Sequence, residues 1–141
     1  MKPPVDPDAP RSLGTHADTS LLDLAVISRL DDDLGHQSVL ELMDLFRAES
    51  ERRRHRIEAA VSARDASAAC HEAHALKGSA LTFGACRLGA LAFKMEQAGR
   101  GGDLEGLISD LPELARLTVE TQAALSRVFA EGDDHCDPES S

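Results

Sequence analysis

The chain has 141 residues, enough for one domain with a core but too few for a nucleotide-binding kinase domain beside a second folded unit. Its 25 acidic residues outnumber 15 basic ones, a formal net charge of −10, which argues against nucleic acid or an anionic membrane as a partner. Aromatic residues make up 3% of the chain, and Leu and Ala dominate its apolar residues. This composition favours a mostly helical protein.

The two ends of the chain differ in composition from its middle. Residues 1–18 hold four prolines and predict a disordered leader, and residues 132–141 predict an acidic, disordered tail. Neither a membrane-spanning apolar run nor a secretory signal is visible. The 3 cysteines lack metal-ligand spacing and are expected to be free thiols. We therefore expect a cytoplasmic protein with one folded domain over residues 19–131.

Helical periodicity runs through the middle of the chain, and no strand pattern interrupts it. Five helical segments are expected at about residues 19–34, 36–64, 65–83, 85–99 and 103–130. Asp65 is the expected N-cap of the third segment, and Gly84 is expected to end that segment. Pro112 interrupts the last segment, either as a kink or near the first turn of a fresh helix that Asp110 caps.

Four long amphipathic segments with short connections predict an all-α fold, an antiparallel up-down four-helix bundle. The short first helix, capped by Asp18, Thr19 or Ser20, is expected to lie across one end of the bundle. A run of four arginines and one histidine, residues 52–56, falls on the second segment. It predicts a solvated helix face, and the alternative is a docking patch for an acidic partner.

The third segment carries the residues with chemical potential. On a helical wheel its apolar residues define a core direction, and His74 points about 140° away from it, towards solvent. Lys77 and Gly78 follow His74 by three and four residues and are therefore its neighbours on the helix surface. Leu81 lies one turn further along the same face. An exposed imidazole, an ammonium group and a bare stretch of backbone suit phosphoryl transfer to histidine, because a neutral ring nitrogen can attack phosphorus.

The stretch Ala73–Ala80, followed by Phe83-Gly84-Ala85, resembles the signature of histidine-containing phosphotransfer (HPt) domains, and the likeness extends over roughly residues 21–130. The resemblance implies a monomeric four-helix bundle that shuttles a phosphoryl group between receiver-domain aspartates in a two-component phosphorelay. The partners it implies are the receiver domain of a hybrid histidine kinase, a response regulator, or both. Mg²⁺ would belong to the partner receiver, so we expect no cofactor and no metal in this chain.

The resemblance also implies roles for single residues. His74 would be phosphorylated, Lys77 would stabilise the phosphoryl charge, and Gly78 would leave room for the receiver. Gly84 would end the helix. On the next helix Glu96 occupies the region where some family members place a glutamine, and it is a candidate for orienting the imidazole.

Leu81, His71 and Cys70 complete the docking surface expected around His74. His71 and His74 also form a His-x-x-His pair, but the metalloprotease and di-iron patterns are absent. Because the chain has no Gly-rich nucleotide motif, we expect a phosphoryl carrier without autokinase activity. The alternative function is a helical module that binds receiver domains without phosphotransfer.

Overall fold

The computed structural model describes residues 21–140, with side chains as far as Phe129. Within this range all regular structure is helical, so the predicted all-α class is confirmed. The helices are α2 (Leu24–Leu34), α3 (His36–Ser62), α4 (Ala66–Thr82), α5 (Cys86–Arg100) and α6 (Leu104–Ser140). The predicted leader, residues 1–18, lies outside the described residues.

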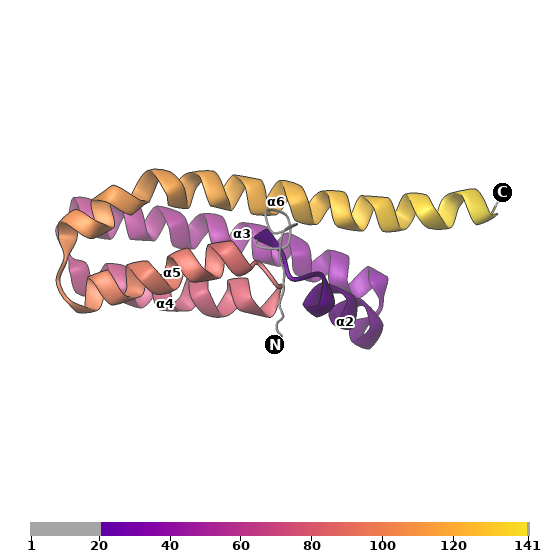
Figure 1. Ribbon diagram of the computed structural model, residues 1–141, viewed down its shortest axis with the longest axis horizontal. Coiled ribbons are helices and arrows are strands. Elements are labelled where there is room, and N and C mark those ends of the chain that lie inside the picture. The colour runs from indigo at the N-terminus through magenta and orange to yellow at the C-terminus, as the bar shows by residue number, and fades with distance from the viewer. Residues whose placement is uncertain (1–20, 141) are drawn as a thin grey trace, which may run out of the picture.

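The four longer helices lie side by side, and each packs against two neighbours (Figure 1). α4 packs on α3 and α5, and α6 packs on the same two helices, so the contacts close a ring. Only residues 63–65, 83–85 and 101–103 connect these helices. α2 packs on α3 beside the end of this group at which α4 turns into α5.

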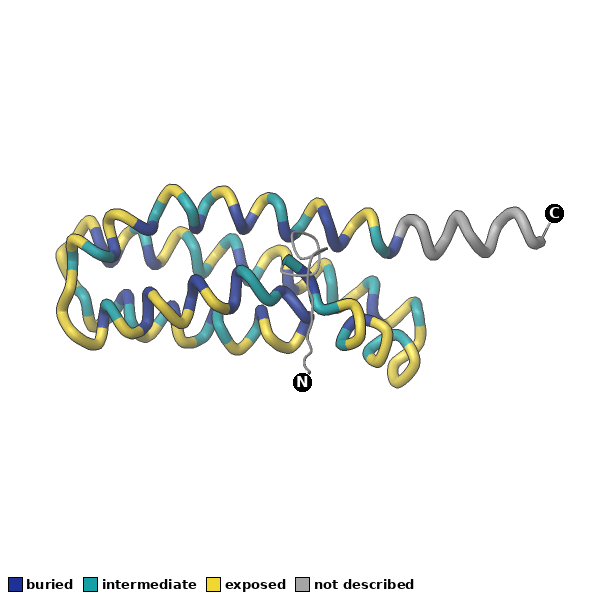
Figure 2. Tube along the Cα trace, in the orientation of Figure 1, coloured by how far each residue is buried: buried dark blue, intermediate teal, exposed yellow. Residues whose placement is uncertain are grey.

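The core lies between these helices, and Figure 2 shows buried positions recurring along each of them. The fully buried side chains include Ile57 of α3, Leu76 of α4, Met95 of α5 and Leu114 of α6. Burying an aliphatic side chain of this size stabilises the fold by about 1.5–3 kcal/mol. The outward direction of His74 follows from this packing, because the core takes the opposite side of α4.

α4 and α5 approach each other more closely than large side chains allow. The buried surface of α4 is mostly alanine, with Ala69, Ala73 and Ala80 fully covered. On α5, a Cβ added to Gly99 would lie 2.8 Å from the carbonyl oxygen of Ala66. Small residues therefore set the short distance between the helix of His74 and the helix of Glu96.

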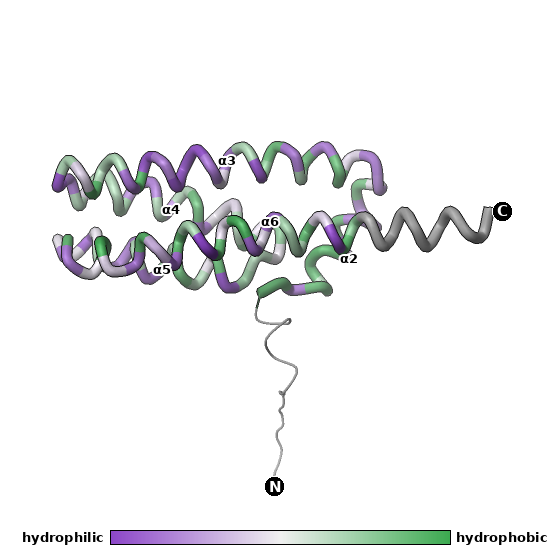
Figure 3. Tube along the Cα trace, turned by 90° about the horizontal axis from the view of Figure 1, so that it is seen from above, coloured by the Kyte–Doolittle hydropathy of each residue, from purple (hydrophilic) through white to green (hydrophobic). Residues whose placement is uncertain are grey.

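The middle of α3 is strongly hydrophilic (Figure 3), and this stretch is the predicted basic run, residues 52–56. Its arginines are paired with glutamates, mostly one turn away on α3. Arg53 also reaches α4, where its Nη1 donates to Glu72 at 2.6 Å. The run is therefore a half-solvated helix face whose arginines pair with glutamates.

The beginning of the described chain differs from the prediction. The helix begins at Leu24, and its N-cap is Asp23, whose carboxylate accepts hydrogen bonds from the backbone N–H groups of Ala25 and Val26. The three predicted caps lie outside the described residues. The Asp23 N–H donates to the carbonyl oxygen of Gly84 at 2.6 Å, which ties the entrance of α2 to the turn between α4 and α5.

α6 is one uninterrupted helix from Leu104 to Ser140. Pro112 lies within it, so the alternative of a fresh helix at Pro112 is wrong. Asp110, the cap that alternative required, is buried and accepts a hydrogen bond from Lys94 of α5 at 3.2 Å. The backbone of residues 132–140, which the sequence assigned to a separate tail, continues the helix.

Gly84 is expected to tolerate a side chain poorly, for reasons of both backbone conformation and space. Its φ is +71°, and an added Cβ would lie 2.8 Å from the backbone oxygen of Asp23. Gly84→Ala should lower the free energy of unfolding by about 2–3 kcal/mol in chemical denaturation. Gly102→Ala is the matched control, because φ there is +72° with open space around the new Cβ, and it should cost about 1 kcal/mol. Equal losses in the two variants would contradict the close contact.

Candidate functional site

α4 presents His74 on the outer surface of the helical domain. The helix begins at its predicted N-cap, Asp65, whose carboxylate accepts the Ala68 N–H at 3.0 Å. It ends where Phe83 and Gly84 turn the chain towards α5. Because the opposite face is buried in the core, the His74 side chain is 65% exposed. The exposed position expected for His74 is confirmed.

Beneath the imidazole lies a buried carboxylate from the neighbouring helix. Glu96 of α5 is only 3% exposed, and its Oε2 lies 2.9 Å from Nδ1 of His74. The ammonium nitrogen of Lys77 lies 2.8 Å from Oε1, the other carboxylate oxygen. Arg100, one turn after Glu96, donates from Nη2 to Oε2 at 2.9 Å. A buried charge needs such partners, and three groups supply them here.

These neighbours keep Glu96 ionised. The Lys77 ammonium, with a smaller contribution from His74, lowers the pKa of Glu96 to about 2, against the opposing effect of burial. An ionised carboxylate can only accept hydrogen bonds, so Nδ1 of His74 must be the donor. Nε2 then carries the free lone pair. The contact with Glu96 therefore fixes both the ring orientation and the nitrogen available for reaction.

Lys77 is held in place from two sides. Its side chain is 23% exposed, and its ammonium nitrogen lies 5.1 Å from the ring centroid of Phe93 on α5, in addition to its ion pair with Glu96. A cation over an aromatic face is stabilised by the ring quadrupole. Lys77 thus lies against α5 beside His74. The sequence predicted only that it would be a neighbour of His74 on the helix surface.

The next turn of α4 leaves its backbone uncovered at Gly78. An added Cβ on Gly78 would meet no atom within 4 Å, so the space above this glycine is free in the isolated protein. Leu81 is 53% exposed, and its Cδ2 lies over Gly89 of α5, where an added Cβ would approach it to 2.8 Å. Gly78 and Leu81 therefore form an open, partly apolar surface beside His74.

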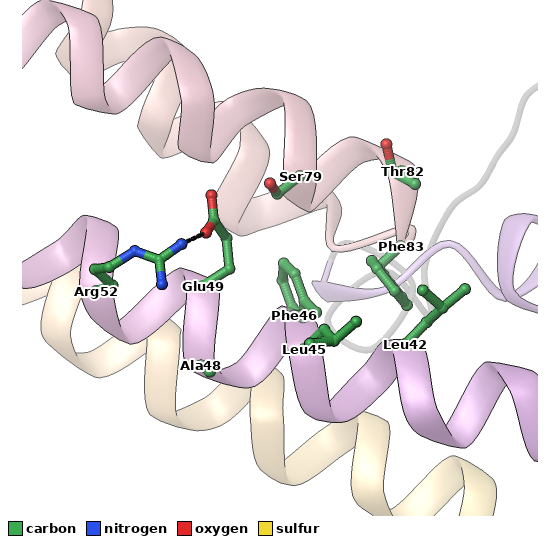
Figure 4. Close-up of a pocket in the computed structure, with 9 residues that line it drawn as sticks. All are labelled: Leu42, Leu45, Phe46, Ala48, Glu49, Arg52, Ser79, Thr82 and Phe83. Carbon is green, nitrogen blue, oxygen red and sulfur yellow. Dashed lines mark hydrogen bonds and ion pairs between the residues drawn. The ribbon is translucent and has the colours of Figure 1, made fainter.

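A groove of about 370 Å³ lies on the α3 side of the same helix (Figure 4). The groove is lined by Ser79 and Thr82 from α4 and by Phe83 from the turn that follows. Its α3 residues include Leu45 and Phe46. Leu45 is mostly exposed, and the Phe46 and Phe83 rings stack with centroids 4.9 Å apart. The exposed ridge of α4 thus has an apolar groove along one side and α5 along the other.

The remaining docking residues that the sequence predicted are placed less uniformly. His71 is exposed one turn before His74. Cys70 is half-buried, because its Cβ packs against Gly99 at the contact of α4 and α5. Of these two, only His71 extends the open surface around His74.

Two members of the site were missed by sequence reasoning, namely Arg100 and Phe93. Arg100 follows Glu96 by four residues, the spacing of an ion pair on a helix surface, and Phe93 precedes it by three. These spacings indicate a role at the site only in combination with the contact between Glu96 and His74. Arg100 is the last residue of α5, directly before the turn at Gly101.

The residues that the structure describes contain neither a membrane-spanning helix nor a cluster of metal ligands. No helix in this part of the chain is long and apolar enough to cross a bilayer. Across the same residues, no three side chains of His, Cys, Asp or Glu lie together as ligands for a metal ion.

The fold and the site together define a class: a helical protein that exposes one histidine whose ring is held by a carboxylate and flanked by a lysine and a glycine. The family model described as Hpt domain matches residues 41–131. The chain belongs to the Hpt domain family.

A crystal structure of histidine-containing phosphotransfer protein B (HptB) from Pseudomonas aeruginosa PAO1 is similar, with a TM-score of 0.75 and 26% sequence identity. The match covers 79% of this chain and 96% of that one. A comparison with curated proteins found no match.

The pairing of Glu96 predicts a specific acid dependence of stability. Its pKa is about 2 in the folded protein and near 4.5 in the unfolded chain. A lowered folded-state pKa contributes stability above the unfolded value, and this contribution is lost as the pH falls from about 4.5 towards 2. In Glu96→Gln, denaturation should therefore show a shallower loss of stability across this range than in the unchanged protein. Parallel curves would contradict the pairing.

Proposed function

We propose that this protein carries a phosphoryl group on His74 and passes it between aspartates of receiver domains in a two-component phosphorelay. Membership of the Hpt domain family supports histidine phosphotransfer in phosphorelays as the general activity. The contact between His74 Nδ1 and Glu96, beneath an exposed ring, carries the assignment to this residue. The donor would be the receiver domain of a hybrid histidine kinase, and the acceptor would be a response regulator.

Phosphoryl transfer requires this chain to position the nucleophile and to offset the charge of the phosphoryl group. Nε2 of His74 attacks the phosphorus of the aspartyl phosphate, and the carboxylate of the receiver leaves. Glu96 orients the ring and keeps the proton on Nδ1. Lys77, which lies beside the ring, offsets the charge of the phosphoryl oxygens. The acidic site and the Mg²⁺ belong to the receiver. Transfer in such relays is reversible, so its direction depends on the partners.

The docking surface is proposed to centre on Gly78 and Leu81. Open space above Gly78 allows the receiver backbone to approach the phosphoryl group. The α3–α4 groove beside Thr82 offers an apolar extension of this surface. Such a contact is small and partly apolar, as transient signalling encounters are.

The scaffold we propose is a monomeric, up-down antiparallel four-helix bundle formed by α3 to α6. The closed ring of contacts and the short connections support this topology. α2 would close one end of the bundle, in keeping with the hydrogen bond between Asp23 and Gly84. The protein is proposed to act in the cytoplasm, where receiver domains are found.

The test is transfer from a phosphorylated receiver domain with Mg²⁺ to the purified protein. The unchanged protein should take up acid-labile, base-stable label. His74→Ala should take up none and keep its fold, because the side chain is mostly exposed. Lys77→Ala should slow transfer by roughly a hundred- to a thousandfold, the effect of losing one electrostatic contact in the transition state. Equal labelling of His74→Ala would refute the assignment, and absence of label with stable complex formation would favour a docking module.

Gly78→Gln should separate stability from function. Glycine inside a helix costs roughly 0.5–1 kcal/mol, so the variant should unfold at higher denaturant concentration than the unchanged protein. Its longer side chain should fill the open space and slow transfer from the receiver at least tenfold. Ser109→Gln, on an exposed position of α6, is the control and should transfer normally. Undiminished transfer in Gly78→Gln would contradict the clearance role.

A further inference from the structure

The contact between Glu96 and His74 has a consequence for the phosphorylated state, and this inference rests on the proposed function. We propose that Glu96 holds the proton on Nδ1 of His74 while the phosphoryl group is bound to Nε2, and that it thereby keeps the phosphohistidine labile. The site would then favour rapid onward transfer over long storage of the phosphoryl group.

The Nδ1 proton decides how readily the imidazole leaves phosphorus. The Nε2 lone pair forms the N–P bond as the O–P bond of the donor breaks, and the bonding electrons leave with the donor carboxylate. No proton leaves the ring, so the product is a phosphoryl-imidazolium that still carries Nδ1–H. When the next carboxylate or a water molecule attacks phosphorus, the N–P electrons return to Nε2 and the ring becomes neutral. A ring that has lost its Nδ1 proton is a poorer leaving group.

The geometry favours retention of the proton. The Nδ1···Oε2 distance is 2.9 Å, and Glu96 is buried and ionised, so a full negative charge lies next to the imidazolium. A carboxylate at this distance accepts a charge-assisted hydrogen bond from the Nδ1–H of the phosphoryl-imidazolium. The same carboxylate lies on the far side of the ring from Nε2, where it also repels the phosphoryl dianion. Both effects shorten the lifetime of the phosphohistidine.

Of the other charges around the site, some weaken the hold of Glu96 on the Nδ1 proton, and the rest face away from His74. Lys77 of α4 and Arg100 of α5 share the Glu96 carboxylate with His74, and Arg100 uses the same oxygen, Oε2. On α3, Arg53 and Arg56 pair with Glu72 on the other side of α4, and on α6 Asp110 pairs with Lys94. His71, one turn before His74 on α4, is also exposed.

Removing Arg100 should therefore strengthen the hold of Glu96 on the Nδ1 proton. Arg100 is 61% exposed, so its loss leaves the core intact. This gives two variants with opposite expected effects on one quantity, the lifetime of phospho-His74.

The lifetime can be measured without any receiver domain. The full-length protein is phosphorylated with phosphoramidate, a small phosphoryl donor, and the decay of the phosphohistidine signal is followed by ³¹P NMR between pH 6 and 9. His74→Ala identifies the signal that belongs to His74. At pH 8 the phosphohistidine of Glu96→Gln should live about tenfold longer than that of the unchanged protein, because a neutral amide holds the proton less firmly. Its lifetime should also lengthen more steeply with rising pH.

Arg100→Gln should shorten the lifetime, and it keeps the proposal testable if Glu96→Gln folds poorly. Glu120→Gln, at a half-exposed carboxylate on α6 that pairs with Arg116, is the control and should decay like the unchanged protein. Equal lifetimes of Glu96→Gln and the unchanged protein at every pH, or a longer lifetime in Arg100→Gln, would overturn the proposal. Receivers that fail to label His74 would instead overturn the proposed function and leave these lifetimes unaffected.

Discussion

A buried carboxylate between two helices is the constraint on which the site depends. Glu96 lies on the covered side of α5, where an unpaired charge would be strongly unfavourable. His74 and Lys77 from α4 and Arg100 from α5 all bind to it. The need to satisfy one charge therefore fixes the orientation of the proposed phosphoryl acceptor and the position of both cations. A reactive group on the surface is held in place from below.

The packing of the helices makes this arrangement possible. Alanines on α4 and glycines on α5 bring the two backbones close, and Gly99 touches the backbone of Ala66 directly. At this distance a glutamate on α5 reaches a histidine on α4. Gly84 and Asp23 then fix the end of the same helix pair through a hydrogen bond between backbone groups. Helix contacts, rather than loops, thus set the geometry around His74, which is how a site gains precision.

The sequence allowed the fold class, the core face of α4 and the exposure of His74 to be predicted, because helical periodicity determines each of them. It did not reveal the bound position of Lys77, since a wheel places a Cβ but not the end of a flexible side chain. Arg100 lies one residue beyond the segment predicted at 85–99, and its role could not be predicted because it depends on a contact between helices. The start of α2 was predicted too early because three polar residues before Asp23 could also cap a helix. At Pro112 the sequence left a kink and a fresh helix open, and α6 continues through this residue.

The central claim is that Nε2 of His74 receives the phosphoryl group while Nδ1 stays bound to Glu96. The most direct measurement is NMR of ¹⁵N-histidine-labelled protein after phosphorylation by a receiver domain. The account predicts a phosphorus–nitrogen coupling at Nε2 of His74 alone, together with a protonated Nδ1. Phosphorus bound to Nδ1, to His71, or to no imidazole at all would contradict it.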